Sequence, residues 1–358
     1  MTWRWLALPL SMVGCIGLQD FGDRDGGGGD GGGDGGLAGD ATLDGGSDGN
    51  GGGDGNGGGD GNGGGDGNGG DGGGDGGNGG PPGTVLVPVS GDVTMIWEDS
   101  NASVALTHLT HDVYVDANEV TVGQFRAWLT ASSPNPCAGK TCTLDPGGPY
   151  QSTILWNPDD DASLGATAYR DASICFTSSN LSNDKGDSPT FLAADDSLPI
   201  NCVTYGQAVA VCAFRGMRLL TEVEWYWMAS GRGQKRKYPW GDTPAAACTD
   251  AILSVSGNND NDCAFPQPVG TPAHDTSRDG VHDLMGSLKE WVGDAYRISR
   301  YPTTLPTDWA GEPRTSSVTV RGGAFATRPA DVENRFVIPF DPTTTSTDIG
   351  FRCAKTKL

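Results

Sequence analysis

Three segments of the chain join a helix-start signal to apolar residues at helical spacing. Each opens with a threonine followed three residues later by Gln or Glu, at Thr121, Thr204 and Thr221. In such a capping box, the hydroxyl and the later side chain satisfy backbone N–H groups at the start of a helix. After Thr121, apolar residues including Phe125 and Trp128 recur three and four positions apart, which is the period of one helical face. The pattern predicts three short helices that bury their aromatic side chains in a core.

The strand-like runs are short. Valine-rich stretches occupy 85–89, 113–115 and 318–320, and Gly, Pro, Asp and Asn interrupt the sequence every few residues between the apolar runs. This pattern is typical of an α+β domain that is poor in regular secondary structure. Residues 81–358 are enough for one sizeable domain, and we expect one there.

The apolar pattern disappears between residues 16 and 80. Most of the 59 glycines lie in this tract, and part of it repeats Gly-Gly-Gly-Asp-Gly-Asn with Asp54, Asp60 and Asp66 at matching positions. A calcium-binding β-roll also repeats Gly and Asp, but it needs an apolar residue in each repeat to fill its interior, and none is present. With almost no apolar side chains, the tract cannot offset the entropy of ordering. We expect a disordered, acidic linker.

The net charge of −22 excludes one class of partner. Many of the acidic residues are aspartates of the linker, and neither the linker nor the remaining chain shows a basic face. Nucleic-acid binding needs such a face, so we expect no nucleic-acid partner.

The first fifteen residues resemble a lipoprotein signal peptide. Arg4 precedes a short apolar run, and Met12-Val13-Gly14-Cys15 resembles a lipobox in which Cys15 receives the lipid. The run is too short to span a bilayer. The alternative is an ordinary secretory signal with an incidental cysteine, but a flexible tract directly after Cys15 suits the tether of an anchored domain. The sequence therefore predicts an extracytoplasmic protein of the cell envelope that contacts the membrane through an N-terminal lipid. Ile16 replaces the aspartate of a retention signal, which favours the outer membrane.

Cysteine usage agrees with export. Nine cysteines are present, and without Cys15 an even set of eight remains. An even set in an exported chain indicates a disulfide framework. A metal site is the weaker alternative, because the chain has no Cys-x-x-Cys pair and only four histidines.

Several longer motifs follow one another in a recognisable order. They are DANEVTVGQF at 116–125, PINCVTY at 199–205, RLLTEVEW at 218–225, YPWGD at 238–242, DLMGSLKEW at 283–291, RGGAF at 321–325 and GFRCA at 350–354. Together they resemble the formylglycine-generating enzyme, or sulfatase-modifying factor, family across nearly all of 81–358. The resemblance implies a C-type-lectin-like α+β domain, which agrees with the pattern of short elements.

The resemblance also implies a chemistry that this chain departs from. Catalytic members oxidise a sulfatase cysteine to formylglycine with oxygen and copper held by two cysteines that follow the Arg-Gly-Gly segment. The matching positions are Thr327 and Val332, and neither side chain replaces the thiolate that copper(I) prefers. Copper binding is therefore not expected, and the sequence favours a non-catalytic binding or accessory module. The alternatives are a formylglycine-forming oxidase that uses other thiols, and a purely structural envelope protein.

Two further expectations come from the family. Its disulfide between the second helix and the C-terminus maps to Cys212 and Cys353, while a second family bridge maps to Ala229 and Val337, two apolar residues. Three more pairings are our own expectation: Cys248 with Cys263, Cys175 with Cys202, and Cys137 with Cys142.

One calcium site of the family also has matching residues. A carboxylate at each end and two backbone carbonyls between them would supply the oxygens that calcium prefers. In the alternative interpretation, the two carboxylates only cap turns. The matching residues are Asp283, Gly286, Leu288 and Glu290.

The region of the missing cysteines is rich in basic residues. Lys289, Arg328 and Arg335 are candidates for binding an acidic peptide, a protein or a glycan, or they are simply solvated charges and salt-bridge partners. His108 and His111 share a short spacing, but on a strand such histidines usually face solvent. Ergothioneine-type sulfoxide synthases share the fold, yet they carry iron-binding histidines in an extra N-terminal domain where this chain has its linker.

Overall fold

The computed structural model describes residues 79–96, 104–131, 137, 140–156, 175, 189–255, 263, 265–272, 274–296, 303–311 and 317–358. The chain divides into two units, Met1–Gly69 and Gly70–Leu358, and all described residues belong to the second. The predictions for Cys15 and for the linker at 16–78 fall outside the described residues.

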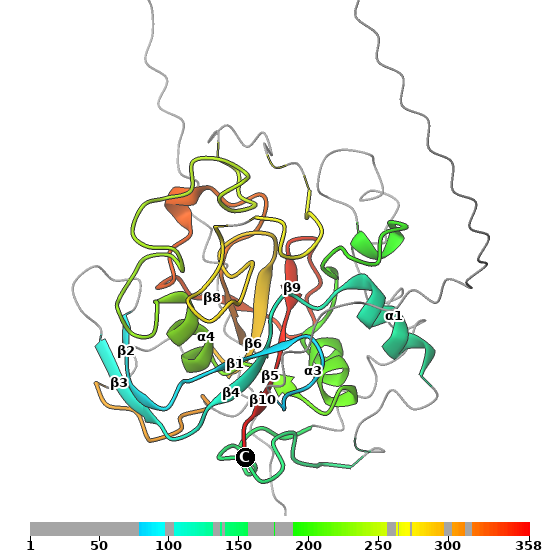
Figure 1. Ribbon diagram of the computed structural model, residues 1–358. Helices are drawn as coiled ribbons and strands as arrows, with labels where there is room; N and C mark the ends of the chain where they lie inside the picture. Colours follow the sequence, from blue (N-terminus) through cyan, green and yellow to red (C-terminus); the bar gives the residue numbers. More distant parts are fainter. Residues whose placement is uncertain are drawn as a thin grey trace, which may run out of the picture. The chain divides into compact units, whose positions relative to one another are not determined.

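The domain has few helices and many short strands, which confirms the predicted α+β class (Figure 1). The helices of the described segments are α1 (Val122–Thr130), α3 (Tyr205–Phe214) and α4 (Glu222–Ala229), with 3-10 turns η3 (Thr190–Leu192) and η4 (Pro329–Asp331). The strands there are β1 (Thr84–Val87), β2 (Gly91–Ile96), β3 (Val104–Leu109), β4 (Val113–Asp116), β5 (Arg218–Leu219), β6 (Lys289–Ala295), β7 (Val318–Arg321), β8 (Ile338–Phe340), β9 (Ile349–Phe351) and β10 (Cys353–Thr356).

All three predicted capping boxes are present. Thr121, Thr204 and Thr221 are the N-caps of α1, α3 and α4, and each hydroxyl accepts a hydrogen bond from the backbone N–H three residues later. The Gln or Glu at that later position accepts in return from the backbone N–H of the threonine. The sequence pattern therefore placed the start of each helix correctly, because this signal depends only on local groups.

The first sheet runs in the order β1-β4-β10-β5, and all of its pairs are antiparallel. Its third member is the last strand of the chain, which lies between β4 and β5 (Figure 1). Consecutive residues of a strand point to opposite faces, and Cys353 and Ala354 of β10 belong to two different apolar clusters. This sheet therefore separates two cores.

Each core receives different helices. The aromatic residues of α4 pack with apolar residues of β1 to β4, whereas α1 and α3 pack in the second core with Trp291 and Phe351. At the positions of the absent family bridge, Ala229 lies in the first core and Val337 packs against that core, so both positions take part in apolar packing.

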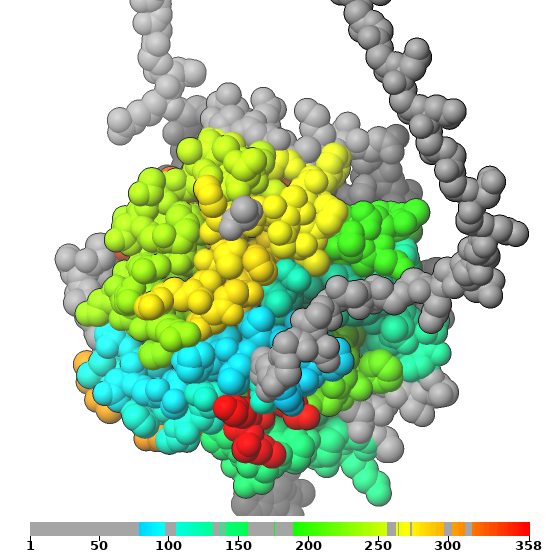
Figure 2. Space-filling view, in the orientation of Figure 1, coloured from blue at the N-terminus to red at the C-terminus, as the bar shows by residue number. Residues whose placement is uncertain are grey.

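Two other sheets complete the domain. Strands β2 and β3 form an antiparallel pair, and the third sheet runs in the order β8-β7-β6-β9, with β6 and β9 parallel. The long loops that follow α4 cover a continuous part of the face seen in Figure 2, beside the N-terminal strands. Within the described segments, no helix is both long and apolar enough to cross a membrane.

The structure contains disulfide bonds, as the cysteine count predicted. The described cysteines pair as Cys137–Cys142, Cys175–Cys202, Cys212–Cys353 and Cys248–Cys263. These are the pairings expected from the sequence and from the family resemblance.

Candidate functional site

The loop after β7 carries the two positions that hold cysteines in catalytic relatives. The Thr327 hydroxyl accepts a hydrogen bond from the Ala324 N–H at 3.0 Å, and the Thr327 carbonyl accepts one from Ser254. Val332 is 1% exposed and belongs to the first core. A Cβ atom added to Gly323 would lie 2.5 Å from the Val332 side chain. Both residues therefore stabilise the loop itself.

This loop packs on a small apolar cluster of its own. Ala324 and Phe325 contact Ile252, Leu288 and the Cys248–Cys263 disulfide. The hydroxyl and methyl groups at Thr327 and Val332 do not fit a copper(I) ion, which needs soft thiolate ligands. The arrangement supports a packed loop rather than a copper centre.

The calcium candidates lie in a cluster of buried carboxylates. Asp283 and Glu290 are each 1% exposed, and they are joined by Glu119 and Asp275, which are 2% and 0% exposed. The Glu119 carboxylate accepts hydrogen bonds from the Ser287 hydroxyl at 2.8 Å and from the Leu288 N–H at 2.9 Å. Asp275 accepts from the Gly286 N–H at 2.9 Å. The candidate loop is thus held from both sides by carboxylates that the sequence analysis did not single out.

Arg352 supplies the positive charge for this cluster. Its Nε donates to the Glu290 carboxylate at 2.8 Å, and its guanidinium also reaches the carbonyls of His282 and Asp283 at 2.7 and 3.2 Å. Arg352 is itself 1% exposed. One buried cation is therefore surrounded by several buried acids.

This imbalance of charge shifts the pKa values of the acids. Burial, and then the charge of Asp283, raise the pKa of Asp275 to about 7. Burial and the neighbouring carboxylates Asp283 and Glu290 raise the pKa of Glu119 well above its usual range. Burial also raises the pKa of Glu290, although Arg352 opposes it. Such a cluster has excess negative charge whenever its acids ionise, and a cation would relieve it.

The fit of a calcium ion to this loop rests mainly on Asp283. One Asp283 oxygen accepts from the Gly270 N–H at 2.6 Å, while the other is buried without a hydrogen-bond partner among the described residues. The Glu290 oxygens already accept from Arg352 and from Trp225. Within the described ranges no group of three or more His, Cys, Asp or Glu side chains is arranged to hold a metal. A calcium ion would therefore depend on Asp283 and on the backbone carbonyls of Gly286 and Leu288.

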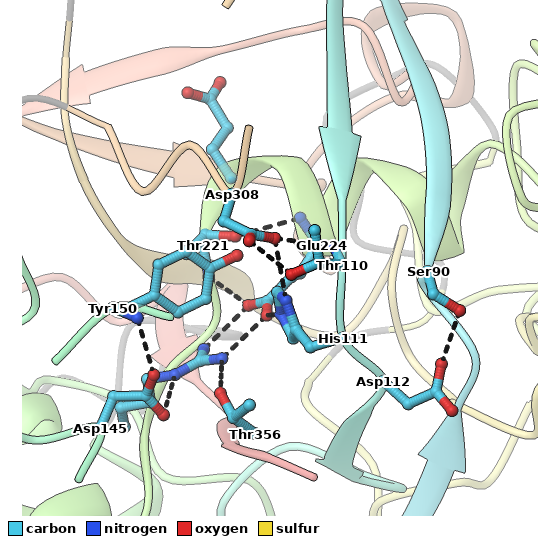
Figure 3. Close-up of polar contacts among 12 residues, drawn as sticks. Ser90, Thr110, His111, Asp112, Asp145, Tyr150, Thr221, Glu224, Asp308 and Thr356 are labelled. Atoms are coloured by element: carbon cyan, nitrogen blue, oxygen red, sulfur yellow. Dashed lines mark hydrogen bonds and ion pairs between the residues drawn. The ribbon is translucent and has the colours of Figure 1, made fainter. Parts of the chain in front are cut away.

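A second buried charge network surrounds His111 (Figure 3). Arg218 donates to both oxygens of Glu224, at 2.9 and 2.8 Å, and lies 3.4 Å from the Asp145 carboxylate. The two ring nitrogens of His111 lie 3.0 Å from Glu224 and 3.1 Å from Asp308. The expectation that this histidine faces solvent is wrong, because it is only 8% exposed.

The charges of this network support one another. Burial opposes the ionisation of Glu224, but the charge of Arg218 and the hydrogen bond from His111 outweigh it and lower the pKa of this carboxyl. Burial likewise opposes a charge on His111, and Glu224 outweighs it, so the pKa of His111 is raised. Asp308 also accepts from the Thr110 N–H at 2.8 Å. The network thus fastens the segment around Asp308 to the turn before β4, which is a structural role.

The three basic candidates each form an ion pair. Lys289 lies 2.5 Å from Asp348, Arg328 lies 2.5 Å from Asp331, and Arg335 lies 2.5 Å from Glu333. In this respect the salt-bridge interpretation agrees with the structure.

Arg335 also lines a pocket. The pocket has a volume of about 260 Å³. Its lining residues are Ile96, Tyr226, Lys235, Arg236, Lys237, Glu333, Asn334 and Arg335.

These features define a disulfide-linked α+β domain with a loop in place of a copper centre. The chain matches the sulfatase-modifying factor enzyme 1-like domain over residues 77–357, so it belongs to that family. Among solved structures, PvdO from Pseudomonas aeruginosa has a TM-score of 0.51 and 18% sequence identity, covering 77% of this chain and 94% of that one. This likeness shows the fold.

The sequence relatives include proteins with different names. Hercynine oxygenase of Mycolicibacterium thermoresistibile is 36% identical over 102 residues, which is 28% of this chain and 21% of that protein. Inactive C-alpha-formylglycine-generating enzyme 2 of Mus musculus is 28% identical over 177 residues, which is 44% of this chain and 49% of that protein. Formylglycine-generating enzyme of Thermomonospora curvata is 27% identical over 180 residues, covering 44% and 55%. The chain spans about half or less of the length of these relatives.

The carboxylates Glu119 and Asp275 were not predicted from the sequence as part of a site. Glu119 lies in the motif at 116–125, and it was treated only as part of that motif. A run of buried acids from separate segments leaves no local spacing signal, because the tertiary fold brings them together. The available signal for such acids was Arg352 in the GFRCA motif. If this arginine is buried, it requires acidic partners.

Proposed function

We propose that this protein is a non-catalytic binding or accessory member of its family. The proposal rests on the packing of the loop at 321–335. Thr327 and Val332 replace the two cysteines, and both are engaged in hydrogen bonding or core packing of that loop. The remaining scaffold, including the capping boxes and the Cys212–Cys353 disulfide, is retained. The domain therefore keeps its fold without the ligands of copper chemistry.

The relatives are compatible with this proposal. One of them is named an inactive member of the formylglycine-generating enzymes, whereas others are named hercynine oxygenase and formylglycine-generating enzyme. The fold and the family therefore do not determine whether this protein is catalytic, and the proposal rests on the residues of the site. In this chain the site residues favour a binding role over catalysis.

The proposed setting is the cell envelope, outside the cytoplasm and anchored to a membrane by a lipid. Cys15 would carry the lipid, and the glycine-rich residues up to Gly80 would act as a flexible, acidic tether. A flexible tether allows the domain to reach ligands at a distance from the membrane. The partner would be a peptide, a protein or a glycan.

The first prediction tests the absence of formylglycine synthesis. The purified full-length protein, supplied with copper and oxygen, should leave the cysteine of a Cys-x-Pro-x-Arg peptide unchanged, because no thiolate pair is present at Thr327 and Val332. Mass spectrometry of the peptide provides the measurement, and an active formylglycine-generating enzyme provides the control. Conversion of the peptide by this protein would contradict the proposal.

We also propose that Asp283, together with the carbonyls of Gly286 and Leu288, binds a structural calcium ion. The unpartnered Asp283 oxygen and the surplus of buried acids support this proposal. Calcium prefers several oxygen ligands, and extracellular modules bind it with a Kd of about 0.1 to 1 mM.

The second prediction is that 10 mM calcium raises the free energy of unfolding by about 1.4 to 2.7 kcal/mol, as expected for a ligand at ten to one hundred times its Kd. Denaturant titrations with calcium or with a chelator provide the measurement. Asp283→Ala should abolish the difference, whereas Asp242→Ala, which removes an exposed carboxylate, should preserve it. An equal effect of calcium on wild type and Asp283→Ala would assign the ion to another place.

A further inference from the structure

The pocket beside Arg335 has an unusual charge for this chain. Four of its lining side chains are cationic and one is a carboxylate, although the whole protein carries a net charge of −22. Three of the cations are consecutive, Lys235 to Lys237, in the loop after α4. A local concentration of positive charge in a hollow attracts anions more strongly than scattered charges do.

The two walls of the pocket are fastened together. Asn334 donates its backbone N–H to the Lys237 carbonyl at 2.8 Å, and its side-chain amide donates to the carbonyls of Ala229 and Arg236. Asn334 is 3% exposed. The basic loop is therefore held in a defined position against the segment that carries Arg335.

The cations of the pocket are only partly neutralised. Glu333 lies 3.2 Å from Lys237 and 2.5 Å from Arg335, so one carboxylate serves two cations. Neither Lys235 nor Arg236 forms an ion pair with a carboxylate in the part of the chain that the structure describes. Lys235 is exposed. Two cations of the pocket thus remain available for an external anion.

A buried hydroxyl lies at the same place. Tyr226 lines the pocket and is 1% exposed. Burial raises its pKa, and a hydrogen bond from the Ile96 backbone to the hydroxyl oxygen partly opposes this. The O–H of Tyr226 has no hydrogen-bond acceptor among the described residues. A buried O–H without an acceptor is costly, and a ligand oxygen would accept its hydrogen bond.

We propose that this pocket binds a phosphate ester. A phosphate monoester carries about −1.5 to −2 charges and three acceptor oxygens at neutral pH, which suits several cations better than a single carboxylate does. Arg236 and Arg335 can pair with phosphate through their guanidinium groups. The apolar part of the pocket, at Ile96 and the ring of Tyr226, suits the organic group of the ester. This inference names the ligand class for the proposed binding role, on which it rests.

The third prediction uses phenyl phosphate as the probe for the full-length protein. Isothermal titration at constant ionic strength should show one binding site per chain. Phenyl phosphate should bind more tightly than inorganic phosphate, because the ring contacts the apolar wall. Lys235→Gln and Arg236→Gln should each weaken binding about tenfold or more, since each removes a charge-assisted hydrogen bond. Tyr226→Phe should also weaken it, because only the hydroxyl is lost.

The matched control is Lys140→Gln, which removes another exposed lysine outside the pocket lining. It should leave the affinity unchanged. Equal weakening by Lys140→Gln and Lys235→Gln would overturn the proposal, as would phosphate binding no tighter than chloride binding. If phenyl phosphate and inorganic phosphate bind with equal affinity, the proposal of a phosphate ester is wrong, and the pocket is a site for inorganic phosphate alone. Formylglycine synthesis by the wild-type protein would overturn the proposed function while leaving this titration unaffected, so the two failures are distinguishable.

Discussion

Replacing Arg218 with methionine should lower the free energy of unfolding by about 3 to 5 kcal/mol, which is the usual cost of breaking a buried ion pair. Arg218 and Glu224 are each 0% exposed, and the arginine donates to both oxygens of this carboxylate. Methionine fills much of the same space but leaves Glu224 and Asp145 without their buried cation. Urea denaturation at neutral pH provides the measurement.

Two variants show whether the loss arises from the uncompensated charge. Arg328→Met removes an exposed arginine whose ion pair with Asp331 is about half exposed, and it should cost less than about 1 kcal/mol. Adding Glu224→Gln to Arg218→Met should recover part of the loss, because glutamine keeps the capping box and removes the stranded charge. A cost below 1 kcal/mol for Arg218→Met alone would show that the network contributes little.

Removing the Cys212–Cys353 disulfide should destabilise the domain by about 5 kcal/mol on the chain-entropy model. The two cysteines are 141 residues apart in the sequence, and the bond joins α3 to β10. Reduction would release a long loop in the unfolded chain, which gains more entropy than a short loop does. Cys212→Ala with Cys353→Ala is the variant, and denaturant titration of the oxidised protein is the measurement.

The shortest bridge of the domain offers the control. Cys137 and Cys142 are five residues apart, so the same model assigns their removal a loss of only about 2 kcal/mol. The order of the two losses is the result that matters. Equal losses, or a larger loss for the short loop, would show that local packing rather than chain entropy determines the contribution of these disulfides.

Local signals of the sequence predicted well what local chemistry determines. The capping boxes at Thr121, Thr204 and Thr221 placed the starts of three helices, and the short valine runs placed β1, β4 and β7. The family motifs also predicted the α+β class. Each of these features depends on groups that are close in sequence or on a motif that remains recognisable.

The buried charges could not be predicted in the same way. His111 meets Glu224 and Asp308, which lie 113 and 197 residues further along the chain. His108 faces solvent as expected, but the same expectation was wrong for His111, because tertiary contacts determine the surroundings of a side chain. The basic pocket was missed for a similar reason, since Arg335 joins Lys235 to Lys237 only after folding. The sequence had instead suggested that Arg335 belongs with Lys289 and Arg328, but those two residues form ion pairs elsewhere.

The position of the last strand determines when the domain can mature. Strand β10 lies between β4 and β5, and one of its residues, Cys353, closes the longest disulfide of the described chain. A chain emerging from a ribosome or a secretion channel presents its N-terminal end first, so the first sheet stays open until the final residues have passed. Folding in this domain therefore depends on contacts between distant parts of the sequence, which form slowly. Until β10 is available, the edges of β4 and β5 that it pairs with stay open, and protection of these edges becomes part of the biosynthesis of the protein.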